Sequence, residues 1–194
     1  MKIFGFNTNN EKRFIHITCN IILGVILAVV FSLSLFSPVS SVVSVTKQSP
    51  IYYGNRKSNN VSLMINVYWG TEYLDDMIAT LKNNNVKTTF FVGGCWVAKN
   101  NEMLKKLDEA GFEIASHGYN HKDHSKLSME KNQDEIYVTH ELVKSIIGRE
   151  MNLFAPPSGS FNDSTLTVAS HLGYKTIMWS RDTIDWRDKD ENLI

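Results

Sequence analysis

The stretch Leu104–Lys126, LKKLDEAGFEIASHGYNHKDHSK, contains a helix, a strand and a histidine cluster in succession. Its pattern predicts a helix that closes at Gly111, followed by a short buried strand over Phe112–Ala115. This strand leads directly into Ser116–Lys126, so the histidines follow its carboxyl end. Because the active sites of α/β folds lie at that end of the strands, the stretch predicts both a fold class and a site.

Three histidines fall close together in this stretch: His117, His121 and His124. A spacing of four residues would place His117 and His121 on the same face of a helical turn, where both can bind one ion. Neutral imidazole is the commonest protein ligand for zinc-like metals. Solvated histidines in a polar turn are the alternative, but the preceding strand favours a metal site. For Asp123 and His124, a solvated loop is favoured over a third ligand.

Strands and helices alternate outward from this stretch. Strands are expected at 62–67, 87–92, 112–115, 152–155 and 175–179, and helices at 72–83, 102–110, 128–147 and 162–172. Such alternation predicts an α/β domain with a parallel sheet, and the spacing fits an open sheet and a barrel equally well.

The amino-terminal part is apolar. No Asp, Glu, Lys or Arg occurs from Phe14 to Thr46, and a helix from Phe14 to Phe36 would span about 34 Å, enough for a bilayer core of ~30 Å. We predict a transmembrane anchor or signal peptide at 14–37, after a net-positive cytoplasmic segment at 1–13. An uncleaved anchor is favoured over a cleaved signal, and either places the remaining chain outside the cytoplasm.

Residues 38–61 are expected to be a linker that tethers without folding, and residues 62–194 the folded domain. The 20 basic and 20 acidic residues cancel, so the chain has no net basic charge that would indicate a nucleic-acid partner. Two distant cysteines do not suggest a disulfide framework.

Residues 62–194 resemble the polysaccharide deacetylases of carbohydrate esterase family four, the NodB-homology domain. The resemblance rests on four segments in the family's order: KTTFFVGG (87–94), EIASHGYNHKDHSKLS (113–128), LFAPPSGSFN (153–162) and GYKTIMWSRDTIDW (173–186). It implies a distorted β/α barrel, here partial, with a divalent metal, expected to be zinc, on His117 and His121. It also implies an acetylated polysaccharide, such as peptidoglycan or a chitin-like glycan, as substrate.

The sequence departs from the family pattern at several positions. Asn66–Gly70 reads NVYWG where the family has T-F-D-D-G, so Tyr68 stands at the general-base position and Trp69 at that of a metal-binding Asp. In the groove motif, Ala155 replaces an Arg and Ser158 an aromatic residue. The family's late histidine, its general acid, has no counterpart before Ile194. We therefore expect that the chain is truncated relative to the family, and that it is marginally stable.

The resemblance and the local pattern together give the expected site residues. Glu72 is the nearest carboxylate for a base role, although an ordinary acid in the first turn of a helix is favoured. Asp185 is implied as the partner of the acid histidine. Substrate contacts are expected from Pro156, Pro157, Ser158, Gly159, Trp69 and Trp186, although core packing is the more usual role of the tryptophans.

Two main functions follow. The first is a metal-dependent deacetylase of cell-surface glycan, and the second a non-catalytic glycan-binding or inactive descendant of that family. Amide hydrolysis of a small substrate is a further alternative.

Overall fold

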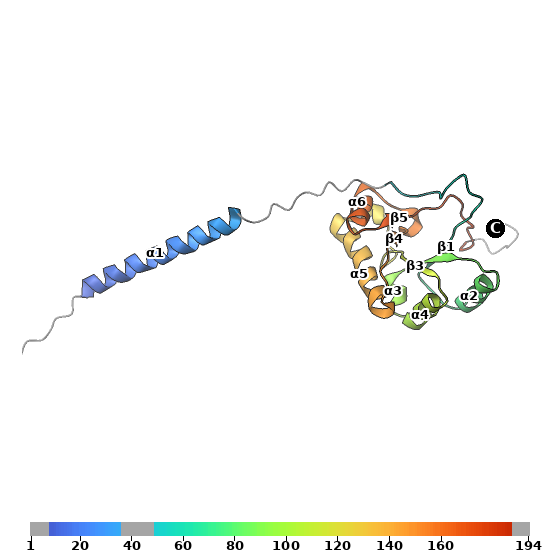
Figure 1. Cartoon of the computed structure of the whole chain (residues 1–194), viewed down its shortest axis with the longest axis horizontal. Helices are drawn as coiled ribbons and strands as arrows, with labels where there is room; N and C mark the ends of the chain where they lie inside the picture. The colour runs from blue at the N-terminus through green and yellow to red at the C-terminus, as the bar shows by residue number, and fades with distance from the viewer. Residues whose placement is uncertain (1–7, 36–48, 188–194) are drawn as a thin grey trace, which may run out of the picture. The chain divides into compact units, whose positions relative to one another are not determined.

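The computed structural model describes residues 8–35 and 49–187, and these form two separate units (Figure 1). The first is a single helix, α1 (Thr8–Leu35), which begins earlier than the predicted 14–37 segment. Its stretch Arg13–Ser32 is long and apolar enough to cross a membrane, and the same features occur in signal sequences. Residues 1–7 of the predicted cytoplasmic segment lie outside the described residues.

The second unit contains a parallel sheet of five strands in the order β1-β2-β3-β4-β5. The strands are β1 (Leu63–Val67), β2 (Thr88–Val92), β3 (Glu113–Ser116), β4 (Leu153–Phe154) and β5 (Lys175–Thr176). This confirms the predicted α/β class and each predicted strand. The last two strands are shorter than expected, because only two residues of each join the ladder.

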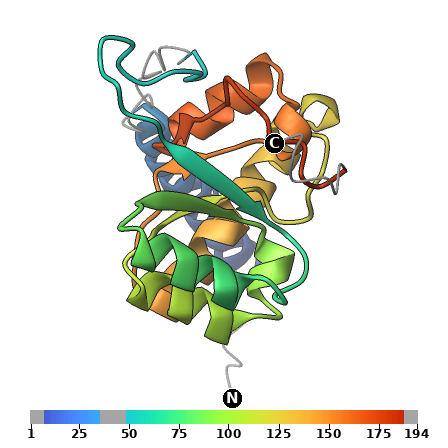
Figure 2. The same ribbon diagram turned by 90° about the vertical axis from the view of Figure 1, so that its right-hand side faces the viewer.

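Helices connect successive strands, as parallel pairing requires. They are α2 (Leu74–Asn83), α3 (Gly94–Val97), α4 (Asn101–Glu109), α5 (Met129–Ile147) and α6 (Asp163–His171), with 3-10 turns η1 (His124–Lys126) and η2 (Pro157–Gly159). Helices α2 and α4 lie side by side, where Lys106 pairs with Asp75 at 3.1 Å (Figure 2). The sequence did not predict α3, which is a single turn.

The predicted caps of α5 and α6 are present. The Ser128 side chain accepts a hydrogen bond from the Lys131 N–H, and Gly148 ends α5 in a left-handed conformation with φ of 70°. Asn162 forms a reciprocal capping box with Thr165 at the start of α6. Local sequence therefore set the bounds of both helices.

The core lies mainly on one face of the sheet. Phe90, Leu104, Leu107, Ile136 and Phe154 are fully buried in one cluster. The opposite face carries a smaller cluster with Phe91, Ala115 and Ala155. Neighbouring Phe90 and Phe91 point to opposite faces because side chains alternate along a strand.

Part of the predicted linker joins the sheet. Ile51 pairs in parallel with Ile177: its N–H donates to the Thr176 carbonyl, and its own carbonyl accepts from the Met178 N–H, both at 2.9 Å. The prediction that residues 38–61 tether without folding is therefore wrong at Ile51, while residues 38–48 lie outside the described part of the chain. A free strand edge has unpaired backbone groups, and Ile51 satisfies two of them beside β5.

Candidate functional site

His117 directly follows β3 and is almost fully buried. Its Nδ1 lies 2.8 Å from the Ala155 carbonyl oxygen. A carbonyl can only accept, so Nδ1 carries the proton and Nε2 keeps a free lone pair. Burial, and then the nearby His121, lower the pKa of His117 to about 3. The imidazole is therefore neutral at physiological pH.

His121 reaches His117 through a loop rather than a helical turn. Residues 117–123 are not helical, so the expectation that both histidines share one helical face is wrong. Gly118 and His121 have positive φ angles of 72° and 53°, which break the helical path. The rings still meet, with centroids 5.2 Å apart, and burial lowers the pKa of His121.

Two aromatic residues follow β1, and the first of them, Tyr68, faces this histidine pair. The Tyr68 ring stacks on His121 with centroids 3.8 Å apart and planes 24° apart, and its centroid lies 6.0 Å from that of His117. Trp69 packs against Tyr68 at 4.7 Å and is 74% exposed. The site thus consists of two imidazoles under an aromatic cover, with one tryptophan open to solvent.

The sequence predicts a zinc ion on His117 and His121. Catalytic zinc sites use three protein ligands and keep one position open. Within residues 8–35 and 49–187, no three side chains of His, Cys, Asp or Glu gather closely enough to hold a metal. Two imidazoles, one of them stacked on a tyrosine, therefore do not fit a catalytic zinc site.

Glu72 lies near the end of β1, but its carboxylate turns back onto its own loop. Its Oε2 accepts from the Thr71 N–H at 2.6 Å, and the side chain is exposed. Hydrogen bonds from the backbone N–H groups of Glu72 itself and of Thr71 lower the pKa of Glu72. Glu72 precedes α2, which begins at Leu74, so it is not an acid in the first turn of that helix as the favoured alternative had it, and its base role stays a prediction.

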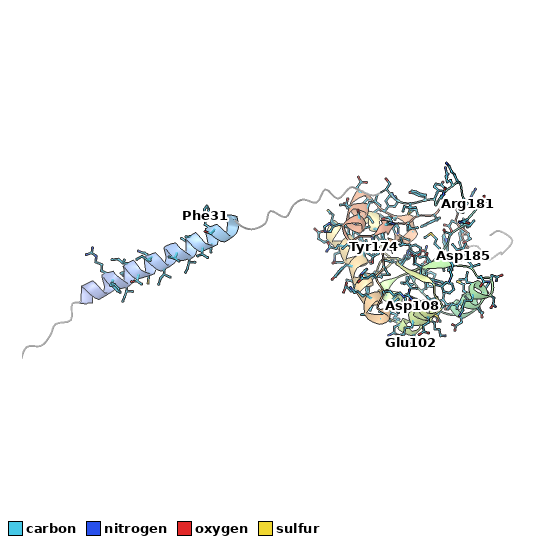
Figure 3. The ribbon with its side chains drawn as sticks, in the orientation of Figure 1. Phe31, Glu102, Asp108, Tyr174, Arg181 and Asp185 are labelled. Atoms are coloured by element: carbon cyan, nitrogen blue, oxygen red, sulfur yellow. The ribbon has the colours of Figure 1, made fainter. Side chains whose placement is uncertain are left out.

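Asp185 lies in the segment that follows β5, on the outside of the domain (Figure 3). Its Oδ1 accepts a hydrogen bond from the Thr183 hydroxyl at 2.7 Å. The adjacent Trp186 is 71% exposed. Both residues are accessible, and their roles in catalysis or substrate binding stay predictions.

The predicted substrate loop, Pro156–Gly159, begins next to His117 because Ala155 holds the His117 ring. Pro156 and Pro157 are buried, whereas Ser158 is exposed with a positive φ of 55°. Trp179 packs closely against Gly159, at 3.1 Å from where a Cβ would stand. The structure therefore brings the start of this loop and the histidine pair together.

His124 does not lie in a solvated loop, so that prediction is wrong. The ring is fully buried, and its Nδ1 lies 2.7 Å from Asn132 Oδ1. Its Nε2 comes so near Gly118 that a Cβ there would stand 2.8 Å away. Burial lowers the pKa of His124, against the opposing effect of the Asn132 hydrogen bond. The ring anchors the loop to α5.

Asp123 ties the histidine loop to the substrate loop. Its Oδ1 accepts from the Ser125 hydroxyl at 2.6 Å and from the Ser160 hydroxyl, and its Oδ2 pairs with Lys126 at 2.9 Å. Asn162 adds a second tie, because its Nδ2 donates to the Ser125 carbonyl at 2.7 Å. The prediction of a solvated Asp123 missed these contacts.

Glu135 on α5 is a further site residue that the sequence analysis missed. It is 7% exposed, and its Oε2 accepts from the N–H groups of Tyr119 and Asn120, both at 2.7 Å. Its position in the helix could have indicated burial, because it falls on the apolar face of α5. Asn132, Glu135, Ile136, Thr139 and Val143 form the buried stripe of α5. An acid within such a stripe requires partners, because a buried charge is costly without them.

A family model described as polysaccharide deacetylase matches residues 53–177. The uncharacterized protein YlxY of Bacillus subtilis is 43% identical over 138 residues, which cover 71% of this chain and 43% of that protein. The peptidoglycan-N-acetylmuramic acid deacetylase PdaA of Bacillus subtilis is 31% identical over 144 residues, which cover 74% of this chain and 55% of that protein.

Solved structures share the fold. BA3943 of Bacillus anthracis, described as a CE4 family pseudoenzyme, has a TM-score of 0.73 at 37% identity, covering 75% of this chain and 52% of that one. A BA3943 mutant described as having restored enzymatic activity has a TM-score of 0.73 at 35% identity, covering 75% and 53%. The chain spans about half the length of these relatives.

Proposed function

The chain belongs to the polysaccharide deacetylase family, carbohydrate esterase family four, and from this premise we propose that its domain binds an acetylated cell-surface polysaccharide without hydrolysing it. The Tyr68–His121 stack carries the proposal. The family resemblance assigns positions 68 and 69 to a general base and a metal-binding carboxylate. Here both positions hold aromatic rings that cannot fill either role.

The chemistry of the site agrees with binding rather than turnover. Amide hydrolysis needs an activated nucleophile, a base that takes its proton and an acid that protonates the amine. Within the described residues, no carboxylate joins His117 and His121 in a metal-binding group, and the Glu72 carboxylate turns back onto the Thr71 N–H. BA3943, which is similar to this chain, is described as a pseudoenzyme, and this description supports the same interpretation here.

The exposed aromatic residues give the site its affinity for sugar. Trp69 is 74% and Trp186 71% exposed, so each offers a ring face on which a pyranose ring can stack. Ser158, the exposed third residue of the Pro156–Gly159 loop, offers a hydroxyl to a glycan oxygen. In this proposal Trp69 is the main contact because it packs on Tyr68, which stacks on His121.

The proposed location is the outer side of the cell membrane. In this proposal helix α1 serves as a single-pass anchor for the domain, and cleavage of α1 would instead release a secreted domain. The similarity to PdaA, named as acting on peptidoglycan, supports a cell-wall glycan as the partner.

The second candidate function is a zinc-dependent deacetylase with a rebuilt site. One observation favours it: the Nδ1 of His117 is held by the Ala155 carbonyl, which leaves Nε2 free, an orientation common among metal-binding histidines. In this alternative, Glu72 acts as the base and Asp185 orients an acid. Against it stands the finding that residues 8–35 and 49–187 provide no third ligand beside the two histidines.

Calorimetry of the full chain in detergent micelles with N-acetylated chitotetraose tests the proposal. We expect binding, and an affinity about tenfold lower for Trp69→Ala, because one ring–sugar stack is lost. Tyr137→Ala is the matched control, since Tyr137 is a half-exposed aromatic residue on α5. Equal affinity of the wild type and Trp69→Ala, or no binding at all, would contradict the proposal.

A further inference from the structure

Helix α5 places one carboxylate beneath the segment that joins the two site histidines. Glu135 Oε2 accepts from the consecutive N–H groups of Tyr119 and Asn120, each at 2.7 Å, and its Oε1 accepts from Asn120 Nδ2 at 2.9 Å. Three donors thus converge on one side chain that is only 7% exposed. Hydrogen bonds to a charged acceptor are shorter and stronger than neutral ones.

These contacts determine the path between the histidines. Tyr119 and Asn120 lie within the four-residue interval from His117 to His121. Three residues lie between the two histidines, and Glu135 binds the N–H groups of two of them. These hydrogen bonds therefore determine the position of His121 relative to the end of β3. The separation of the two rings, 5.2 Å between centroids, therefore depends on Glu135.

The loop conformation needs such a restraint. His121 has a positive φ of 53°, an uncommon conformation for a residue with a Cβ, and such conformations persist when their surroundings over-determine them. A third metal ligand, which could hold both rings through a shared ion, is absent from the described residues. The loop is instead tied to α5 by Glu135 and, further along, by the contact between Asn132 and His124.

We infer that Glu135 is the positioning residue of this site: its carboxylate holds the His117–His121 loop so that His121 lies under Tyr68, without a metal ion. The carboxylate acts through the Tyr119 and Asn120 N–H groups that it binds. The inference rests on the proposed function in one respect, namely that this stack belongs to the glycan-binding surface.

Glu135→Gln in the full chain, in detergent micelles, tests the inference against Glu141→Gln. Glutamine keeps the size of the side chain, but one carboxylate oxygen becomes an NH2 donor. In one orientation this NH2 faces the Asn120 Nδ2 donor, and in the other it faces the backbone N–H donors, so hydrogen bonds are lost either way. Glu141 is the matched control because it lies on the same helix and is exposed. Three quantities are compared: hydrogen exchange of the Tyr119 and Asn120 amides, the ring-current shift of the His121 imidazole protons, and chitotetraose affinity.

We expect Glu135→Gln to speed exchange of both amides at least about tenfold and to move the His121 resonances toward those of free histidine. Affinity should fall in parallel, and Glu141→Gln should change none of the three. Unchanged His121 resonances in a folded Glu135→Gln protein would overturn the inference. If that variant does not fold, Glu135→Asp replaces it: the charge stays while the shorter side chain cannot reach all three donors, so the same shifts are expected.

The two claims fail separately. The His121 resonances are read without glycan, so they test Glu135 even if no glycan binds. His121 resonances that stay unchanged in Glu135→Gln, together with intact glycan binding, would contradict the positioning role and leave the proposed function standing.

Discussion

Tyr68 lies face to face on His121, with ring centroids 3.8 Å apart and planes 24° apart. This pairing places an aromatic ring against one of the two imidazoles that the family resemblance assigns to a metal ion. The neighbouring position is also aromatic, because Trp69 packs on Tyr68. A surface built in this way favours sugar stacking over the activation of water.

Restoring carboxylates should restore metal binding. In the double variant Tyr68→Asp, Trp69→Asp, a carboxylate ligand at position 69 joins the two imidazoles and position 68 regains a base, so zinc affinity should rise by at least about tenfold over the wild type. Calorimetric titration with zinc measures the change. Adding His117→Ala to the double variant is the control and should remove the gain. Equal zinc affinity in the wild type and the double variant would count against the assignment of these positions.

Removal of metal should leave the wild-type fold unchanged. The histidine loop is held by Glu135, Asn132 and Asp123 rather than by an ion. A chelator should therefore not lower the melting temperature of the full chain, since only a ligand bound to the native state adds to its stability. A decrease that zinc reverses would show that an ion contributes to the fold.

Asn162 should contribute to stability in two ways. Its Oδ1 caps α6 through the Thr165 N–H at 3.0 Å, and its Nδ2 donates to the Ser125 carbonyl at 2.7 Å. Asn162→Ala should lower the free energy of unfolding by about 1–2 kcal/mol in urea denaturation. Asn162→Asp keeps the cap and loses the Ser125 contact, so its loss should be smaller. Equal losses in the two variants would mean that the cap contributes nothing.

Glu150 should make stability depend on pH. Hydrogen bonds from Lys144 and then from His140, each at 2.6 Å, lower the pKa of Glu150 below its usual 4.5. A carboxylate with a lowered folded-state pKa stabilises the protein above its unfolded pKa, and this contribution is lost as pH falls through the folded value. The effect should be small because the Glu150 side chain is 63% exposed.

Glu150→Gln should therefore melt slightly below the wild type at pH 7, with the difference vanishing as pH falls below 4.5. Melting curves across pH 3–7 measure this, with Glu141→Gln as the control. A difference that persists at pH 3 would contradict the pairing.

Much of the fold could be predicted from local patterns. The KTTFFV run and the helix closing at Gly111 gave β2 and β3, because periodicity and turn residues act within a few positions. Ser128 and Asn162 predicted the starts of α5 and α6, since capping depends on side chains within three residues.

The site was less predictable because it depends on contacts between distant residues. The four-residue spacing between His117 and His121 could not reveal that Gly118 and His121 adopt positive φ angles. The burial of His124 depends on Asn132 from another element, and the edge contact of Ile51 with Ile177 joins residues far apart in sequence. Such contacts are made by the fold as a whole and leave little trace in a local pattern.

Acetate release tests the central claim most directly. The full chain in detergent micelles is incubated with N-acetylated chitotetraose and with peptidoglycan, each with and without added zinc, and free acetate is measured over time. We predict no acetate above the background of a His117→Ala sample, although chitotetraose binds. Acetate release by the wild type that zinc increases and His117→Ala abolishes would contradict the claim and favour the zinc-dependent deacetylase.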